Sequence, residues 1–323
     1  MGAQRYLIRK VLHAVVTLLF VLAANFFLFR IMPGDPVALL ARSQRISQEE
    51  QARQIAALGL DKPLPEQLVI YFRETLQGNL GISVINPRQV TEMIGERLWP
   101  TILLVGTSTI FSTLIGLWIG IRGAWRRGTV FDSSTLYGSL VLYSMPEGWF
   151  AMIMLITFAG LLGLFPTAHY STPLSDATGL GHVVDVANHM FLPCLTLTLG
   201  YIGEYAIVMR SSLLEVMNED FVTTARAKGL RDKMVRRRHA VPNALLPTLT
   251  LVFYSFGFVL GGAIIIETVF TWPGLGRLTY TAIGQRDFPV MQGVFLLFST
   301  AVIVFNLLAD ILYGYLDPRV REA

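Results

Sequence analysis

The sequence of 323 residues is poor in charge: only 15% of its residues are Asp, Glu, Lys or Arg, whereas 53% are hydrophobic. Soluble domains carry about 25% charged residues, so this composition excludes an ordinary soluble domain and indicates a membrane protein. Cys194 is the only cysteine, which excludes an intrachain disulfide and a cysteine-rich metal site. The basic residues lie beside apolar segments, and no basic domain stands apart, so nucleic acid is not an expected partner.

Lysine is scarce as well, and none of the four lysines follows a glycine-rich loop. The phosphate-binding sequence G-x4-G-K-[ST] does not occur in the chain. We therefore expect no ATP site on this chain.

Long apolar runs are what the sequence has in abundance. A helix that crosses a bilayer needs about 20 mostly apolar residues. Five windows meet this requirement plainly, namely residues 11–29, 101–121, 190–209, 244–266 and 290–309. A sixth run, 133–165, is longer and carries Pro146 beside Glu147, so it is either one tilted, kinked helix or two short pieces. We predict an all-α polytopic membrane protein with six transmembrane helices.

The basic residues orient these helices. An even number of spans puts both termini on one side, and most Lys and Arg residues then fall on the side of the termini. The positive-inside rule makes that side the cytoplasm. The densest basic stretch, residues 225–247, lies between the fourth and fifth spans, and from charge alone it would be an orientation signal.

The chain divides into three predicted parts. Residues 1–32 hold the cytoplasmic amino terminus and the first helix. Residues 33–98 form a small extracytoplasmic segment, in which Leu68, Val69, Phe72 and Leu76 predict a short amphipathic helix. This helix would lie on the outer membrane surface or on the other spans, or the segment is a connector without a task of its own. Residues 99–323 form a five-helix core that contains a cytoplasmic loop, 210–243.

The order of residues in this loop predicts more than an anchor. Asp220 is a good helix N-cap, and Gly229 suits the left-handed position that follows a helix, so a short helix is expected between them. Asp232 could begin a second, basic helix, which Pro242 would separate from the fifth span. A loop needed only for orientation would not require this order.

The spacing TTA-x3-G-x9-HAVP, from Thr223 to Pro242, resembles the EAA loop of bacterial ABC importer permeases. Four further stretches are similar to permeases of the dipeptide/oligopeptide/nickel importer family: MPGDP, GLDKPLPEQ with GNLGIS, GGAIIIETVFTWPGLGRL and NLLADILYGYLDPRVR. They follow one another in the same order along the whole chain. The loop departs from the general pattern at Thr223, Thr224, His239 and Val241, where that pattern has Glu, Ala, Ile and Leu.

The resemblance implies a type I ABC importer permease in the bacterial inner membrane. The loop would contain a coupling helix that docks into a groove on a cytoplasmic ATPase. The residues assigned to this contact are Asp220, Phe221, Thr223, Thr224, Ala225, Arg226, Ala227, Lys228, Gly229, His239 and Pro242. The implied partners are a second homologous permease, two ATP-binding subunits, an extracytoplasmic substrate-binding protein and membrane lipids. ATP and Mg²⁺ would bind the ATPases, and this chain would be neither an enzyme nor a cofactor or metal carrier.

Acidic residues within spans are costly and suggest a function. Glu147 and Glu204 are therefore candidates for the translocation pathway, where a carboxylate could attract the ammonium group of a peptide. The alternative for both is a hydrogen bond to a neighbouring helix or to the partner permease. The candidates for contact with the binding protein are Glu267, Trp272, Pro273 and Gly274, with a structural role as the alternative for Glu267.

The cargo and two other classes of protein stay open at this point. Di- or oligopeptides are the expected cargo, with nickel, glutathione or a haem-like molecule as alternatives. A secondary transporter usually has an internal repeat and ion-coupling groups, and here there is no visible repeat and only two lone glutamates. A membrane metalloenzyme could use His169, His182 and His189, but their spacing fits no helical ligand pair.

Overall fold

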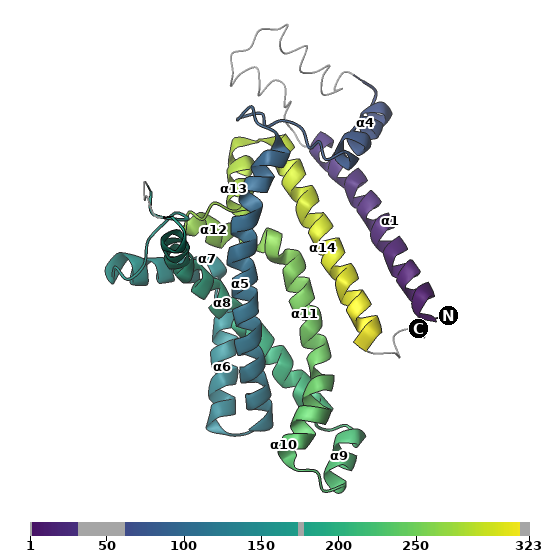
Figure 1. The fold of residues 1–323 in the computed structure, drawn as a ribbon, viewed down its shortest axis with the longest axis vertical. Helices are drawn as coiled ribbons and strands as arrows, with labels where there is room; N and C mark the ends of the chain where they lie inside the picture. Colours follow the sequence, from purple (N-terminus) through teal and green to yellow (C-terminus); the bar gives the residue numbers. More distant parts are fainter. Residues whose placement is uncertain (1, 32–61, 174–177, 317–323) are drawn as a thin grey trace.

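The computed structural model describes residues 2–31, 62–173 and 178–316, and these residues form helices joined by short connections (Figure 1). The MPGDP motif, Asp176 and the end of the carboxyl-terminal motif lie outside the described residues. Within them, four helices are long and apolar enough to cross a membrane. These are α1 (Gly2–Ile31), α5 (Val90–Trp125), α8 (Leu180–Val216) and α14 (Phe288–Leu316).

The long predicted run at 133–165 is two helical pieces. Helix α6 (Val130–Ser144) and the piece that starts with α7 (Glu147–Met154) and continues as the π-helix η1 (Leu155–Leu161) are bent by 101° at their junction. Met145 is extended because it precedes Pro146, whose ring disfavours the helical conformation of the preceding residue. The pair could count as a fifth span.

The remaining predicted span corresponds to α11 (Val241–Gly262). The described residues thus give four spans, or five with the bent pair, and the number six stays a prediction. In the part of the chain that the structure describes, the regular secondary structure is helical apart from one isolated bridge between Ile82 and Gln89. The predicted division at residue 98 falls inside α5, which begins eight residues earlier at Val90.

Helix α8 is the centre of the core, with α5 along one side and α6 along another. At Gly203 the backbone of α8 meets α6 so closely that an added Cβ would overlap the Ser139 carbonyl oxygen and lie 3.2 Å from the Tyr143 nitrogen. A small residue at this position therefore permits the close approach of the two helices.

Helix α1 lies beside α14 and is held there at both ends (Figure 1). Near its start, the Tyr6 hydroxyl donates to the Asp310 carbonyl at 3.0 Å, and Lys10 pairs with the Asp310 carboxylate at 2.9 Å. Near its end, Asn25 donates to the Gln292 carbonyl at 3.2 Å. Asn25 thus forms an interhelical hydrogen bond between α1 and α14. The start of α1 and the end of α14 lie at the same end of the molecule.

Helix α4 (Leu64–Leu76) confirms a helix in the predicted extracytoplasmic segment. Of its predicted apolar residues, Val69 and Leu76 are 68% and 73% exposed, whereas Leu68 and Phe72 are half-buried. Helix α4 contacts α1 through both rings and polar groups: the Tyr71 and Phe26 ring centroids lie 5.6 Å apart, Asn25 donates to the Tyr71 hydroxyl at 3.0 Å, and Arg30 donates to the Gln67 side chain. A position on the outer membrane surface stays a prediction.

The two ends of the molecule carry different short helices (Figure 1). At one end lie α9 (Asp220–Ala227), α10 (Asp232–Val235) and the π-helix η2 (Arg236–Ala240). In the opposite half of the molecule, beside the amino-terminal half of α5, lie α12 (Ile264–Val269) and α13 (Leu275–Gln285). The loop predicted to be cytoplasmic and the segment around Glu267 are therefore far apart along the long axis.

Replacing Gly203 by Ala should destabilise the protein, because the new Cβ meets backbone atoms of α6 that cannot move without shifting the helix. We expect a loss of roughly 1–3 kcal/mol, the usual cost of overpacking, seen as a lower Tm of the purified protein in detergent. Gly200→Ala is the matched control, since its Cβ would meet nothing within 4 Å on the same helix. Equal Tm values for the two variants would contradict the close contact.

Candidate functional site

Helix α9 begins at Asp220, one residue earlier than predicted, because its N-cap is Glu219. Glu219 is the N-cap, with extended backbone (φ −72°, ψ 148°), and Asp220 is the first helical residue. No side chain caps the first turn, so the prediction that Asp220 is the N-cap is wrong. The negative charge of Asp220 still lies in the first turn, where it interacts favourably with the helix dipole.

The predicted end of α9 is confirmed. Gly229 has φ +75°, the left-handed conformation in which glycine carries no steric penalty. Its N–H donates to the Arg226 carbonyl at 2.9 Å, and the Leu230 N–H donates to the Ala225 carbonyl at 3.4 Å. This pair of bonds is the Schellman motif, which satisfies carbonyls that the helix itself leaves free.

Helix α9 has one buried face and one exposed face. Val222 and Ala225 are buried in an apolar cluster with Met209 and Leu213 of α8 and Ala124 of α5. Ala225, which was predicted to contact the ATPase, therefore faces the permease core and packs α9 against it. The exposed face consists of Asp220, Phe221, Thr223, Thr224, Ala227 and Lys228.

The basic segment after α9 differs from its prediction. Helices α10, η2 and α11 follow one another without a break, so Pro242 does not separate a basic helix from the next span. Pro242 lies in the first turn of α11 directly after η2, so the continuous helical run passes through a residue that has no N–H to donate. The turn before it is widened, because the Val241 N–H donates to the Arg236 carbonyl five residues back. His239 is half-buried in this wide turn, and Pro242 is exposed.

Two arginines of the loop contact the end of α5. The guanidinium carbon of Arg226 lies 5.9 Å from the centroid of the Trp125 ring, and that of Arg236 lies 5.5 Å from it. Arg226 also approaches the Asp232 carboxylate at 3.8 Å. The indole thus joins α5 to both halves of the loop through cation–π contacts. The sequence alone did not single out Trp125, although a tryptophan at a helix end beside arginines was a usable signal.

The two predicted pathway residues lie on different helices, α7 and α8. Glu147 is half-buried at the start of α7, directly after the sharp bend, and Glu204 is half-buried on α8. Both carboxyl groups are within electrostatic reach of the Tyr201 hydroxyl on α8. The Oε1 atom of Glu147 is buried, and no hydrogen-bond partner for it lies within the described part of the chain.

Glu267 is fully buried in α12, and its carboxylate is the centre of a hydrogen-bond network. The Thr101 hydroxyl of α5 donates to Oε1 at 2.7 Å, and the Arg277 backbone N–H donates to Oε2 at 3.1 Å. The same hydroxyl accepts the Leu275 N–H at 2.8 Å. A buried carboxylate needs such partners, because an unpaired one is very costly.

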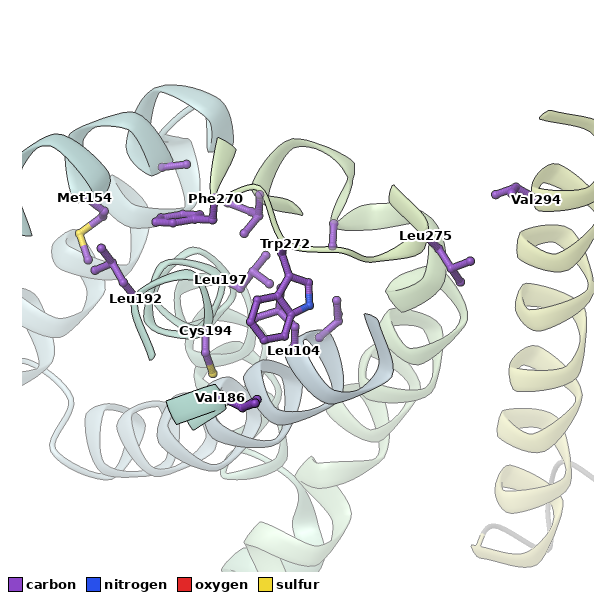
Figure 2. Packing of buried hydrophobic residues seen from close by; sticks show 14 of the residues in the cluster. Leu104, Met154, Val186, Leu192, Cys194, Leu197, Phe270, Trp272, Leu275 and Val294 are labelled. Carbon is purple, nitrogen blue, oxygen red and sulfur yellow. The ribbon is translucent and has the colours of Figure 1, made fainter. Parts of the chain in front are cut away.

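Trp272 is also fully buried, and Figure 2 shows its indole among Leu104, Leu197 and Cys194. Its Nε1–H donates to the Pro100 carbonyl of α5 at 2.9 Å. The side chains of Glu267 and Trp272 therefore fix the α12–α13 segment onto α5 and are not presented to a partner. The structural role weighed for Glu267 is the one its geometry supports.

The α12–α13 segment has exposed side chains close in sequence to the residues predicted to contact the binding protein. Gly274 is buried and Pro273 is half-buried, whereas Tyr280 and Ile283 of α13 are 58% and 54% exposed. The sequence analysis missed both residues. A signal for them was available in the sequence, because helical spacing puts Tyr280 and Ile283 on a different face of α13 from Leu275 and Ala282, which are buried.

The loop histidines do not come together as metal ligands. Within the described residues, no group of three or more His, Cys, Asp or Glu side chains could hold a metal ion. The Nδ1 atom of His189 lies 2.9 Å from the Asp185 carbonyl oxygen, and the Asp185 carboxylate accepts both the N–H and the hydroxyl of Thr172 at 2.7 Å. These residues hold the Thr172 segment on α8.

Two family models match the sequence. A model described as the inner membrane component of binding-protein-dependent transport systems matches residues 84–322. A second, described as the N-terminal part of the membrane component of these systems, matches residues 3–105.

Curated relatives match along nearly their whole length. The dipeptide transport system permease protein DppB of Escherichia coli (strain K12) is 36% identical over 335 residues, covering 98% of this chain and 99% of that protein. The glutathione transport system permease protein GsiC of Pectobacterium atrosepticum is 38% identical over 318 residues, with 98% of both proteins covered.

The fold is similar to that of a solved transporter. A chain of the MetNI methionine ABC transporter, in an inward-facing crystal form, matches with a TM-score of 0.54 and 18% identity, covering 70% of this chain and 96% of that one. The chain therefore belongs to the family of binding-protein-dependent transport system inner membrane components, and it is a multi-pass, non-catalytic permease subunit of an ABC importer that works with ATPase and binding-protein partners.

Proposed function

We propose that this permease imports peptides, and that the exposed face of α9 is the surface through which ATPase subunits drive it. The observation that carries the proposal is the division of α9 into two faces. Val222 and Ala225 are anchored on α5 and α8, while Thr223, Thr224 and Ala227 stay exposed. Small side chains on a short, capped helix suit entry into a groove.

The proposed complex contains a second homologous permease and two ATP-binding subunits. The carboxyl end of α8 leads into α9, and α10 and η2 lead directly into α11. A rigid-body movement of α9 would therefore reach the two helices that flank it in the chain. With α9 in the cytoplasm, both termini lie on the same side, which agrees with the pairing of Lys10 and Asp310 near the two ends.

The proposed pathway contains Glu147, and Glu204 is a secondary candidate. A carboxylate attracts the ammonium group that a peptide carries at its free amino terminus. The buried Oε1 of Glu147, for which the described residues offer no hydrogen-bond partner, supports this role, and Glu147 also interacts electrostatically with Tyr201 of α8. Relatives named for dipeptides and for glutathione are both consistent with a cargo that carries a free amino group. Nickel and haem-like cargo are the alternatives.

The outer surface of the α12–α13 segment is proposed as part of the contact with the binding protein. Pro273 remains a candidate from the sequence, and Tyr280 and Ile283 are added because they are exposed. Glu267, Trp272 and Gly274 would act indirectly, since they hold this surface in place.

Ala227→Arg should weaken ATPase association more than tenfold, because a bulky charge on the exposed face cannot enter a groove without losing its hydration. The measurement is co-purification of the ATPase subunits with the permease. Asn218→Arg is the control, as it adds the same side chain at an exposed position of the same loop just before α9. Full association of the Ala227 variant would refute the assignment. A deletion of residues 221–229 is a poorer test, since it also removes Val222 from the core.

Glu147→Gln should slow peptide uptake about tenfold or more, since charge-assisted hydrogen bonds contribute about 1.5–3 kcal/mol. Uptake is measured in vesicles that contain the complete transporter, with saturating amounts of peptide-loaded binding protein. Glu215→Gln, an exposed change near the end of α8, is the control and should transport normally. Unchanged uptake by the Glu147 variant, with normal ATPase association, would remove Glu147 from the pathway.

A further inference from the structure

Helix α5 contacts both proposed partner surfaces. Its carboxyl end carries Trp125, beside α9, and its amino-terminal half carries Pro100 and Thr101, beside α12 and α13. Figure 1 shows α5 running between these two ends of the molecule.

The inner contact is specific to the indole of Trp125. It is partly buried in the apolar cluster that holds Val222 and Ala225. The guanidinium groups of Arg226 and Arg236 lie over the same ring, one from α9 and one from η2. A displacement of α9 therefore acts on the end of α5 through both packing and charge.

The outer contact is made of directional hydrogen bonds in a fully buried setting. The Thr101 hydroxyl bonds Glu267 of α12 and Leu275 of α13 at once, at 2.7 and 2.8 Å. The Pro100 carbonyl accepts the Trp272 Nε1–H at 2.9 Å. Because Thr101, Glu267 and Trp272 are all fully buried, these bonds do not exchange freely with water, and the α12–α13 segment must follow this part of α5.

The stretch between the two contacts is continuous helix. Pro100 is the only proline within α5, so the segment from Thr101 to Trp125 has no break, and at 1.5 Å per residue it is roughly 37 Å long. It lies along α8, where the Ser108 hydroxyl donates to the Cys194 carbonyl at 3.3 Å. A continuous, well-supported helix moves as one body, which gives coupling between distant sites a physical carrier.

We propose that α5 links the coupling helix α9 to the outer α12–α13 segment, with Trp125 and Thr101 as positioning residues at its two ends. Docking of the binding protein on the outer segment then changes the position of α9, and closure of the ATPases changes the outer segment. Such coupling is reciprocal by thermodynamic necessity. The proposal rests on the proposed role of α9 as the ATPase contact.

The test uses the complete transporter in lipid vesicles and compares its basal ATPase rate with the rate in the presence of its dipeptide-loaded binding protein. Trp125→Leu and Thr101→Val should each leave the basal rate within about twofold and reduce the stimulation at least fivefold. Trp125→Phe keeps a ring and Thr101→Ser keeps the hydroxyl, so both should retain most of the stimulation. The double variant should lose no more than the single ones, since residues that act through one element are not additive.

Trp272→Phe is a second variant in case the Thr101 variant fails to fold, because it removes the bond to the Pro100 carbonyl and keeps an aromatic side chain in the core, although it leaves a small cavity. It too should lower stimulation while the ATPases still co-purify. Normal stimulation in Trp125→Leu and Trp272→Phe would overturn the link through α5. If instead α9 were not the ATPase contact, the Ala227→Arg variant would still bind the ATPases, and this result distinguishes that failure from failure of the link through α5.

Discussion

The apolar contact that holds Val222 and Ala225 against the carboxyl-terminal ends of α5 and α8 is the interaction on which the loop between α8 and α11 depends. A helix of eight residues is too short to be stable alone in water. Packing on a larger surface stabilises it, and this packing also decides which of its faces is free. The same contact that makes α9 a helix therefore makes it a rigid projection with an exposed, small-residue face.

The opposite end of the molecule is held by a different kind of interaction. Glu267 and Trp272 are polar or partly polar, yet both are fully buried. Their burial is tolerated because Thr101, Pro100 and the backbone of Arg277 supply hydrogen bonds of good geometry. Directional bonds fix the α12–α13 segment onto α5 more specifically than apolar contact would. One end of α5 is thus held mainly by packing and cation–π contacts, and the other by hydrogen bonds.

The bend after α6 connects local chemistry with the proposed pathway. Pro146 ends the helix because it lacks an N–H and restricts Met145, and the chain turns by 101°. This turn puts Glu147 at the start of α7, near Tyr201 of α8. The acidic side chain thus belongs to the first turn of a new helix and not to the stripe of residues that one straight helix would have formed.

The sequence by itself determined the features that follow from nearest neighbours in the chain. Apolar runs placed α1, α5, α8 and α14, and Gly229 fixed the end of α9, because hydropathy and left-handed backbone are local properties. Only the tertiary structure decided what depends on contacts between distant segments. In the tertiary structure Ala225, Glu267 and Trp272 are buried, whereas Val69 is exposed. The basic segment continues as a π-helix into α11, which contains Pro242. The physical reason is that burial and hydrogen-bond partners are set by helices far apart in sequence, such as α5 and α12, which no local pattern brings together.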